Sequence, residues 1–206
     1  MVHVSTHPLL QHKMARLRAK DTPSPEFRDL MAMISRVLFF EALQDVELTP
    51  VQVQTPLTTM TCRKIAEKIG LVPVLRAGLG MAEAMLQALP EASVWHLGLY
   101  RDHATLKPVT YYNKLPPLPE MDTALMLDPM LATGGSAIAA IEILKNVGIP
   151  RIKFVGLIAA PEGVAALQAH HPEVPIYLAA LDERLNEKGY IVPGLGDAGD
   201  RQFGTG

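Results

Sequence analysis

Residues 124–144, ALMLDPMLATGGSAIAAIEIL, join a short apolar run, an aspartate, a glycine pair and an amphipathic segment. The run 124–127 predicts a buried strand, because it is apolar and bounded by turn residues. A helix is predicted over 136–147, where one apolar stripe recurs at helical spacing and a glycine and a proline follow as stop signals. The stripe consists of Ile138, Ile141, Leu144 and Val147. A strand, a turn and a helix in this order predict part of a βαβ unit.

The same alternation continues on both sides of this stretch and predicts an α/β fold with a central parallel sheet flanked by helices. The predicted strands span 72–75, 94–100, 124–127, 152–158 and 176–181. The predicted helices span 80–89, 136–147 and 163–170. Pro73 conflicts with a strand inside the sheet, since proline cannot donate to a ladder and usually marks an edge or a strand start.

The first 70 residues are predicted to be mainly helical. Apolar residues recur at helical spacing over 27–43, after the start signal Ser-Pro-Glu at 24–26. A second helix is predicted over 62–69, with extended chain at 51–56 between the two. The polar, proline-rich segment 101–119 predicts a projecting hairpin or flexible loop outside the sheet.

Composition restricts the function classes. The chain has 206 residues, 49% of them apolar, and 19 Lys plus Arg against 21 Asp plus Glu, so no basic surface for nucleic acid is predicted. The single Cys62 cannot form an internal disulfide. The sequence has no secretory signal pattern and no apolar run long enough to span a membrane. We therefore expect a water-soluble, cytoplasmic protein without nucleic-acid or membrane partners.

The turn after the strand at 124–127 has the composition of a phosphate site. The pair Gly134-Gly135 allows the backbone to wrap around an anion at a helix N-terminus, and Thr133 and Ser136 add hydroxyl donors. An ordinary capped turn is the alternative, and the glycine pair by itself would favour it. The strand-to-helix context favours phosphate binding. The turn is neither a Walker loop, since no lysine follows the glycines, nor a GxGxxG motif.

The string DPMLATGGS at 128–136 resembles the 5-phosphoribosyl 1-diphosphate (PRPP) loop of uracil phosphoribosyltransferases. Pro129 stands where a second acidic residue is common in the wider phosphoribosyltransferase family. The resemblance implies a type I-like fold with a central parallel sheet under a small hood. It also implies that Asp128 faces the ribose hydroxyls and that Ala132 to Ser136 hold the 5-phosphate. The implied PRPP-binding residues of this loop are Asp128, Pro129, Met130, Leu131, Ala132, Thr133, Gly134, Gly135 and Ser136.

Two further segments carry arginines that could face a pyrophosphate. In VLRAGLGM, at 74–81, Arg76 offers a planar fork of donors and Gly78 permits close backbone approach. This motif is similar to the family's pyrophosphate loop, which implies PRPP binding by Arg76, Ala77 and Gly78. Arg101, in YRD, also resembles a family arginine that contacts pyrophosphate. The alternatives are a solvated surface arginine and a hairpin charge paired with Asp102.

The segment YIVPGLGDAGDRQFGT, at 190–205, is rich in glycine yet carries apolar anchors that a disordered tail would not need. It resembles the family's base-recognition segment. The resemblance implies that Ile191, Gly196, Asp197 and Ala198 bind uracil, largely through the backbone, and that Asp197 also reaches the ribose. The expected organisation is a single domain over 1–206, with a helical part at 1–70, an α/β core at 71–181 and a base-recognition hood segment at 182–206.

The activity implied by the resemblance is conversion of uracil and PRPP to UMP and diphosphate. Arg76, Arg101, Asp128 and Asp197 are the implied catalytic residues. Mg²⁺ is implied as the cofactor, carried mainly by PRPP without dedicated protein ligands. Family members form dimers or tetramers, and some are activated by GTP, so a homodimer or homotetramer and a GTP effector are implied partners. No segment predicts a GTP site.

Two other functions fit part of the pattern. One is a non-catalytic regulator with the same fold that senses PRPP or a pyrimidine nucleotide. The absence of a basic stripe speaks against an RNA-binding version of it. The other is a phosphate-binding hydrolase of the doubly wound class, which leaves the order of the C-terminal segment unexplained.

Overall fold

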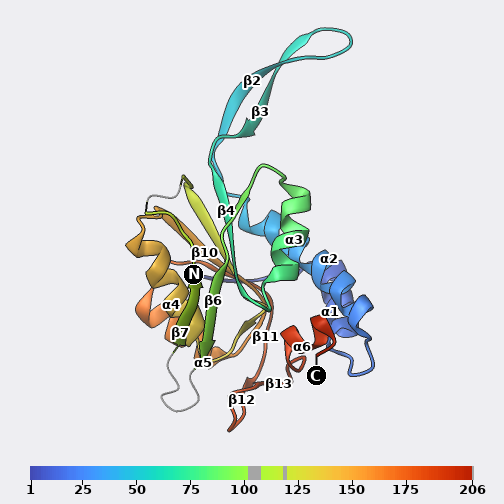
Figure 1. Ribbon diagram of the computed structural model, residues 1–206. Helices are drawn as coiled ribbons and strands as arrows, with labels where there is room; N and C mark the ends of the chain where they lie inside the picture. The colour runs from blue at the N-terminus through green and yellow to red at the C-terminus, as the bar shows by residue number, and fades with distance from the viewer. Residues whose placement is uncertain (102–107, 118–119, 206) are drawn as a thin grey trace.

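The computed structural model describes residues 1–101, 108–117 and 120–205. Its main sheet has the order β1-β11-β10-β8-β4-β6-β7, and the short strands β5 and β9 pair with β4 and β10 (Figure 1). Every pairing in it is parallel except β6 with β7. The strands of this sheet are β1 Val2–Val4, β4 Ile69–Leu75, β5 Ser93–Val94, β6 Leu97–Arg101, β7 Pro108–Asn113, β8 Thr123–Leu127, β9 Met130–Leu131, β10 Arg151–Ala159 and β11 Ile176–Leu181.

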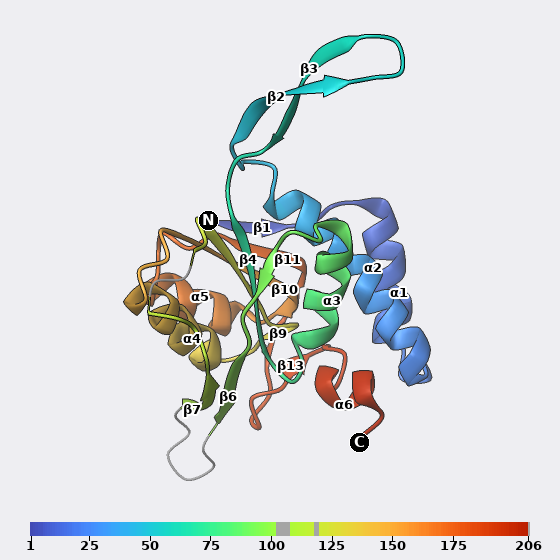
Figure 2. The same ribbon diagram turned by 45° about the horizontal axis from the view of Figure 1, so that its top comes forward.

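Helices cover both faces of the sheet. α1 (Pro8–Arg18), α2 (Ser24–Ala42) and α3 (Leu79–Ala88) lie on one face, and α4 (Gly135–Asn146) and α5 (Pro161–His170) on the other (Figures 1 and 2). β8 shows why: all five of its residues are buried, and Leu125 packs with the first group of helices while Met126 packs with the second. Strands buried on both faces are typical of parallel sheets. The predicted α/β class, with a central parallel sheet flanked by helices, is confirmed.

Pro73 lies inside the sheet, paired with Leu127 of β8. Its missing N–H does not break the ladder, because on the side of β4 away from β8 no strand residue in the described part of the chain is paired with Pro73. β5 ends at Val94 and β6 begins at Leu97, so the single strand predicted over 94–100 is two strands in the structure. The gap between them accommodates the proline.

The predictions for the N-terminal part are half right. α2 confirms the helix predicted over 27–43, but the helix predicted over 62–69 is wrong. That segment belongs to a hairpin of β2 (Leu48–Gln54) and β3 (Thr59–Ile65), which projects from the body (Figures 1 and 2). Thr55 starts its turn, accepting from Leu57 N–H and Thr58 N–H. The register depends on pairing across this turn, which helical periodicity does not detect.

The segment expected to project, 101–119, lies partly in the sheet. β7 pairs antiparallel with β6 and forms the edge of the main sheet, which corrects that prediction. Residues 102–107 and 118–119 lie outside the described part. The projecting arm of the molecule is the β2–β3 hairpin.

Candidate active site

The turn between β8 and α4 forms a small cavity of about 70 Å³. Gly134 precedes α4 with φ of 84°, a backbone conformation that favours glycine. Among the described residues, the N–H groups of Gly135, Ser136 and Ala137 have no acceptor, as is usual for the first turn of a helix. Three free donors at the positive end of a 12-residue helix are suited to bind an anion. The cavity lining consists of Asp128, Met130, Leu131, Ala132, Thr133, Gly134, Gly135, Ser136 and Ala137.

Asp128 lies where β8 ends and is half-buried. Its Oδ1 accepts the N–H of Met130 at 3.1 Å, and burial raises the pKa of this carboxyl to about 6. The carboxylate is therefore ionised at neutral pH and loses its charge in mild acid. It lines the same cavity as the free N–H groups, so it can accept hydrogen bonds from hydroxyl groups of a bound anion.

Pro129 and Leu131, both predicted to bind PRPP, hold the loop in place through their backbone carbonyls. Pro129 does not line the cavity, and its carbonyl accepts N–H groups of Leu157 and Ile158 at 3.0 Å. Leu131 is 1% exposed, and its carbonyl accepts Ala160 N–H at 3.0 Å. These bonds fix the loop to the neighbouring strand. The available donors belong to the second half of the motif.

The turn after β4 places Arg76 and Gly78 beside the end of β8. A Cβ on Gly78 would lie 2.4 Å from the carbonyl oxygen of Leu127, so a larger residue would push the turn away. The Arg76 side chain is 59% exposed and pairs with Asp200 at 3.6 Å. Its guanidinium also lies 5.9 Å from the centroid of the Phe203 ring. Arg76 is thus held by the C-terminal segment and remains accessible to a ligand.

The C-terminal segment contains β13 (Ile191–Val192), which pairs with β12 (Arg184–Leu185), and the short helix α6 (Ala198–Phe203). Ile191 and Ala198 are 5% and 2% exposed and pack in the core, so only their backbones can meet a ligand. Gly196 and Asp197 line a second cavity, of about 410 Å³. The Asp197 carboxylate accepts the N–H of Asp200 at 2.9 Å and caps α6.

Three arginines hold this segment against the N-terminal helices. Arg18 donates to Asp182 at 2.8 Å and to the Gly194 carbonyl at 2.7 Å. Arg201 donates to the carbonyls of Leu17, Ala19 and Leu195, and its guanidinium stacks over Phe27 at 4.6 Å. Arg28 donates to the Gln202 carbonyl at 2.9 Å.

The sequence predictions missed these anchors and Asp200. The one local signal was the pair Asp200-Arg201 within a glycine-rich stretch. A glycine-rich loop needs charged anchors of this kind to hold one conformation.

The turn at 76–78 connects the C-terminal segment with the loop at 128–136, which we call the phosphate loop after its predicted ligand. On one side it contacts the end of β8 through Gly78. On the other side a Cβ on Gly199 would lie 3.9 Å from that of Ala77, next to the pair of Arg76 with Asp200. The phosphate loop and the C-terminal segment line two separate cavities, so the turn lies between two half-sites.

Arg101 ends β6, opposite Pro108 of β7. Its backbone is described and its side chain lies outside the described part. Its role in pyrophosphate binding stays a prediction.

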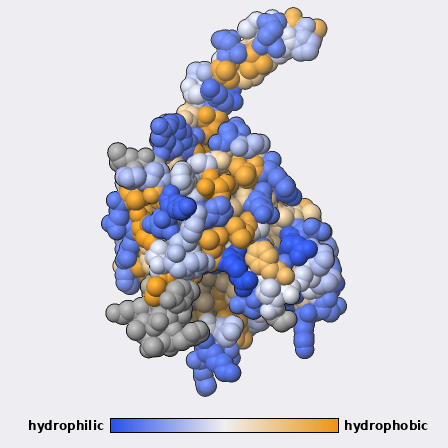
Figure 3. Space-filling model, in the orientation of Figure 1, coloured by the Kyte–Doolittle hydropathy of each residue, from blue (hydrophilic) through white to orange (hydrophobic). Residues whose placement is uncertain are grey.

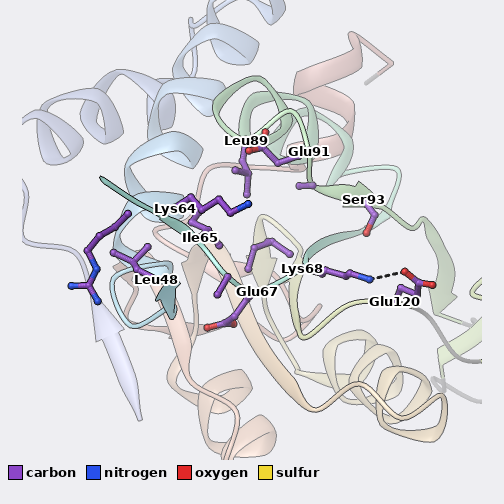
Figure 4. A pocket seen from close by; sticks show the side chains of 13 residues that line it. Leu48, Lys64, Ile65, Glu67, Lys68, Leu89, Glu91, Ser93 and Glu120 are labelled. Carbon is purple, nitrogen blue, oxygen red and sulfur yellow. Dashed lines mark hydrogen bonds and ion pairs between the residues drawn. The ribbon is translucent and has the colours of Figure 1, made fainter. Parts of the chain in front are cut away.

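A much larger cavity, of about 680 Å³, lies elsewhere. It is at the base of the β2–β3 hairpin, by the start of β4, whereas the phosphate loop follows the carboxyl end of β8. Lys64, Leu89 and Glu91 face it, and Lys68 pairs with Glu120 at 2.6 Å across its rim (Figure 4). In open α/β sheets ligands bind outside the carboxyl ends of strands. Size alone therefore does not identify the active site.

Within the described ranges, no group of three or more His, Cys, Asp or Glu side chains is arranged to hold a metal ion. In the same part of the chain, no helix is both long and apolar enough to cross a membrane.

Residues 4–205 match the family model of uracil phosphoribosyltransferase. The chain is 62% identical over 205 residues to the uracil phosphoribosyltransferase of Roseiflexus castenholzii, covering 100% of this chain and 99% of that protein. It is 55% identical to that of Bacillus velezensis, covering 99% and 98%. A solved structure of the AQ2163 protein from Aquifex aeolicus superposes with a TM-score of 0.92 at 41% identity, covering 100% and 99%.

The fold extends to more distant proteins. A hypoxanthine-guanine phosphoribosyltransferase from Bacillus anthracis superposes with a TM-score of 0.52 at 11% identity, covering 77% of this chain and 80% of that one. At this identity the likeness concerns the fold alone. The family model and the full-length relatives above show that the chain belongs to the uracil phosphoribosyltransferase family.

Proposed function

We propose that this protein catalyses transfer of the phosphoribosyl group of PRPP to uracil, giving UMP and diphosphate. The observation that carries the proposal is the row of free N–H groups at 135–137, behind the left-handed Gly134 and beside an aspartate. These donors would bind the 5-phosphate. The curated relatives carry the name of this enzyme, and nothing favours the alternative of a non-catalytic sensor.

In the proposed reaction the C1–diphosphate bond of PRPP breaks and a bond from uracil N1 to C1 forms. Positive charge develops on the ribose ring, and negative charge develops on the departing diphosphate. The Arg76 guanidinium would stabilise the leaving group, together with Arg101, by exchanging Asp200 for the phosphate oxygens. Asp128 would orient the ribose by accepting its hydroxyl hydrogens. The proton on uracil N1 leaves to solvent or to the diphosphate.

Mg²⁺ is the proposed cofactor, and it would neutralise charge on the diphosphate. The residues present fit this role, because a magnesium ion that keeps substrate phosphates and waters as ligands needs one or two protein carboxylates at most. Asp128, a half-buried carboxylate in the phosphate loop, is available for it.

Uracil would bind beside the C-terminal segment, to backbone groups of Ile191, Gly196 and Ala198, with Asp197 toward the ribose. Backbone N–H and C=O groups are fixed donors and acceptors. Cytosine reverses the donor and acceptor at two adjacent positions of its ring, which would leave buried groups unpaired. Such a mismatch lowers kcat/KM by orders of magnitude in sites built for one pattern.

We propose a homo-oligomer that covers the β2–β3 hairpin. A two-stranded hairpin without further packing is marginally stable in water. This one exposes apolar side chains along its length (Figure 3), namely Leu48, Val53, Leu57 and Met60. The sedimentation coefficient of wild type and of a variant lacking 49–64 would test it. A monomer in both cases would contradict the proposal.

We propose that residues 1–206 form one domain, because the N-terminal helices and the C-terminal segment pack in one core with the sheet.

The cavity at the base of the β2–β3 hairpin is proposed as the place to test for GTP binding, because its volume of about 680 Å³ suits a nucleotide and Lys64 faces it. GTP should activate wild type more than Lys64→Gln. We propose a cytoplasmic location.

The proposed function is tested by mixing the protein with PRPP, Mg²⁺ and one nucleobase at a time. UMP should form with uracil and at least 100-fold more slowly with cytosine, a ratio that unpaired buried groups can produce. Comparable rates with both bases would contradict backbone recognition of uracil. No product with any base would contradict the proposed function.

A further inference from the structure

Gln202 is a buried amide without a partner. Its side chain lies on α6 and is 1% exposed. Neither its Oε1 nor its Nε2 makes a hydrogen bond within the described part of the chain. Burying unpaired polar groups costs free energy, and native structures contain few of them. The position of Gln202 therefore requires an explanation.

The carboxamide occupies the space left by a glycine at the start of α3. A Cβ on Gly80 would lie 2.1 Å from Gln202 Oε1 and 2.5 Å from Met31 Cε. Gly80 and Met81 belong to the first turn of α3, where their N–H groups have no acceptor among the described residues. An unpaired acceptor thus lies next to two unpaired donors, without a hydrogen bond between them.

The same helix contacts the turn that precedes α3. Asp200 pairs with Arg76, and Gly199 approaches Ala77. On its other side α6 is fixed to α2, because Arg28 donates to the Gln202 carbonyl at 2.9 Å. Gln202 is therefore held by its backbone, while its side chain faces a turn whose arginine is expected to move toward a ligand.

We propose that Gln202 is a positioning residue for PRPP. When the turn at 76–78 closes on the diphosphate, the first turn of α3 moves with it, and Gln202 Oε1 accepts one of its N–H groups. The hydrogen bond is absent in the free protein and present in the complex, so it favours the complex. This inference rests on the proposed function, because it assigns the diphosphate to that turn.

The test is Gln202→Met, which keeps the length of the side chain and removes both polar groups. We expect the Tm of the free protein to rise, since two unpaired buried groups are lost. The increase in Tm caused by PRPP should shrink, and the KM for PRPP should rise roughly five- to tenfold, the factor expected for one hydrogen bond. The KM for uracil should stay within twofold. A merely structural role predicts a lower Tm of the free protein and an unchanged PRPP response.

Gly80→Ala is the second variant, because its Cβ displaces the carboxamide. It should raise the KM for PRPP by a similar factor. The double variant should be no worse than the poorer single one, since both remove the same interaction. Gln44→Met, on an exposed glutamine, is the matched control and should behave as wild type.

The inference is overturned if wild type is active and Gln202→Met keeps the wild-type KM for PRPP and Tm response, or if the effects of the two variants multiply. An inactive wild type instead contradicts the proposed function.

Discussion

The phosphate loop and the C-terminal segment are both rich in glycine, but they obtain their shapes in different ways. The loop is held by the regular elements beside it: β8 precedes it, α4 follows it, and N–H groups of β10 donate to its Pro129 carbonyl. The C-terminal segment is held by residues far away in the chain. Arg18 and Arg28 are more than 160 positions from the groups they bind.

The difference follows from how each segment offsets its loss of conformational entropy. A turn between a strand and a helix has two ends fixed by regular hydrogen bonds, so few residues must be ordered in addition. A glycine-rich segment with a short hairpin and a six-residue helix has no such support. It needs charged side chains that bind several carbonyl or carboxylate oxygens at once.

The largest effect is expected from loss of a contact that holds the C-terminal segment to the N-terminal helices, the pair of Arg18 with Asp182. Asp182→Ala removes a carboxylate that is 3% exposed, accepts from Gly194 N–H at 2.8 Å and pairs with Arg18. We expect the free energy of unfolding to fall by about 3–5 kcal/mol, because one member of a buried ion pair is lost. The KM for uracil should rise more than that for PRPP. Chemical denaturation and steady-state kinetics measure the two effects.

Asp21→Ala is the control for the anchor, because Asp21 is 80% exposed and also pairs with an arginine. Its effect should stay below about 1 kcal/mol. Equal effects of the two variants would remove the distinction between the anchored segment and the loop.

The next effect concerns the residue between the two regions. Arg76→Ala should lower kcat about 100-fold, the size of effect seen when a donor to a developing negative charge is removed. The Tm should change little, because the side chain is 59% exposed. Rapid-quench measurement of diphosphate release separates chemistry from product release. An unchanged kcat and KM for PRPP would exclude Arg76 from charge stabilisation.

Substitutions of Gly134 and Gly135 test whether the shape of the phosphate loop depends on its own backbone conformation. Gly134→Ala should lower the free energy of unfolding by about 1–2 kcal/mol, because φ is 84° and the new Cβ would lie 3.1 Å from the Gly163 carbonyl oxygen. Gly135→Ala meets nothing closer than Thr133 Oγ1 at 3.9 Å and should fold normally. Calorimetry with and without PRPP compares them. Equal stability of both variants would contradict the assigned geometry.

The smallest expected effect is a pH dependence. Since burial raises the pKa of Asp128 to about 6, the ionised form, which is proposed to accept the ribose hydroxyls, is lost as the pH falls through 6. kcat/KM for PRPP should fall about tenfold from pH 7 to pH 5. Asp128→Asn should be slower at pH 7 and lack this step, while ionisation of PRPP itself affects both proteins equally.

The same raised pKa has a consequence for stability. Folding above pH 6 must keep a half-buried carboxyl ionised, which opposes folding, and this cost disappears as the pH falls toward 4. Asp128→Asn should therefore unfold at a higher temperature than wild type at pH 7, with the difference shrinking in acid. A constant difference across this range would contradict the raised pKa.

Sequence alone predicted the strands and helices whose signals are local. The unit at 124–147 and helix α2 were found because each has a strong apolar period and clear start or stop residues. The β2–β3 hairpin was missed, since most of its residues are exposed and little of it, such as Ile65 at its base, packs against the core. β7 was missed because it lies within a polar, proline-rich stretch typical of a loop, and because its residues 109–113 are exposed and show no buried face.

For the site, the sequence determined which residue types can bind phosphate, because the donors of a turn at a helix N-terminus come from the backbone of consecutive residues. Only the tertiary structure decided which carbonyls Arg201 binds, which glycine leaves room for Gln202, and that the turn at 76–78 connects the two half-sites. Those contacts join residues distant in the chain. Their geometry is set by the packing of helices on a sheet and by no single segment.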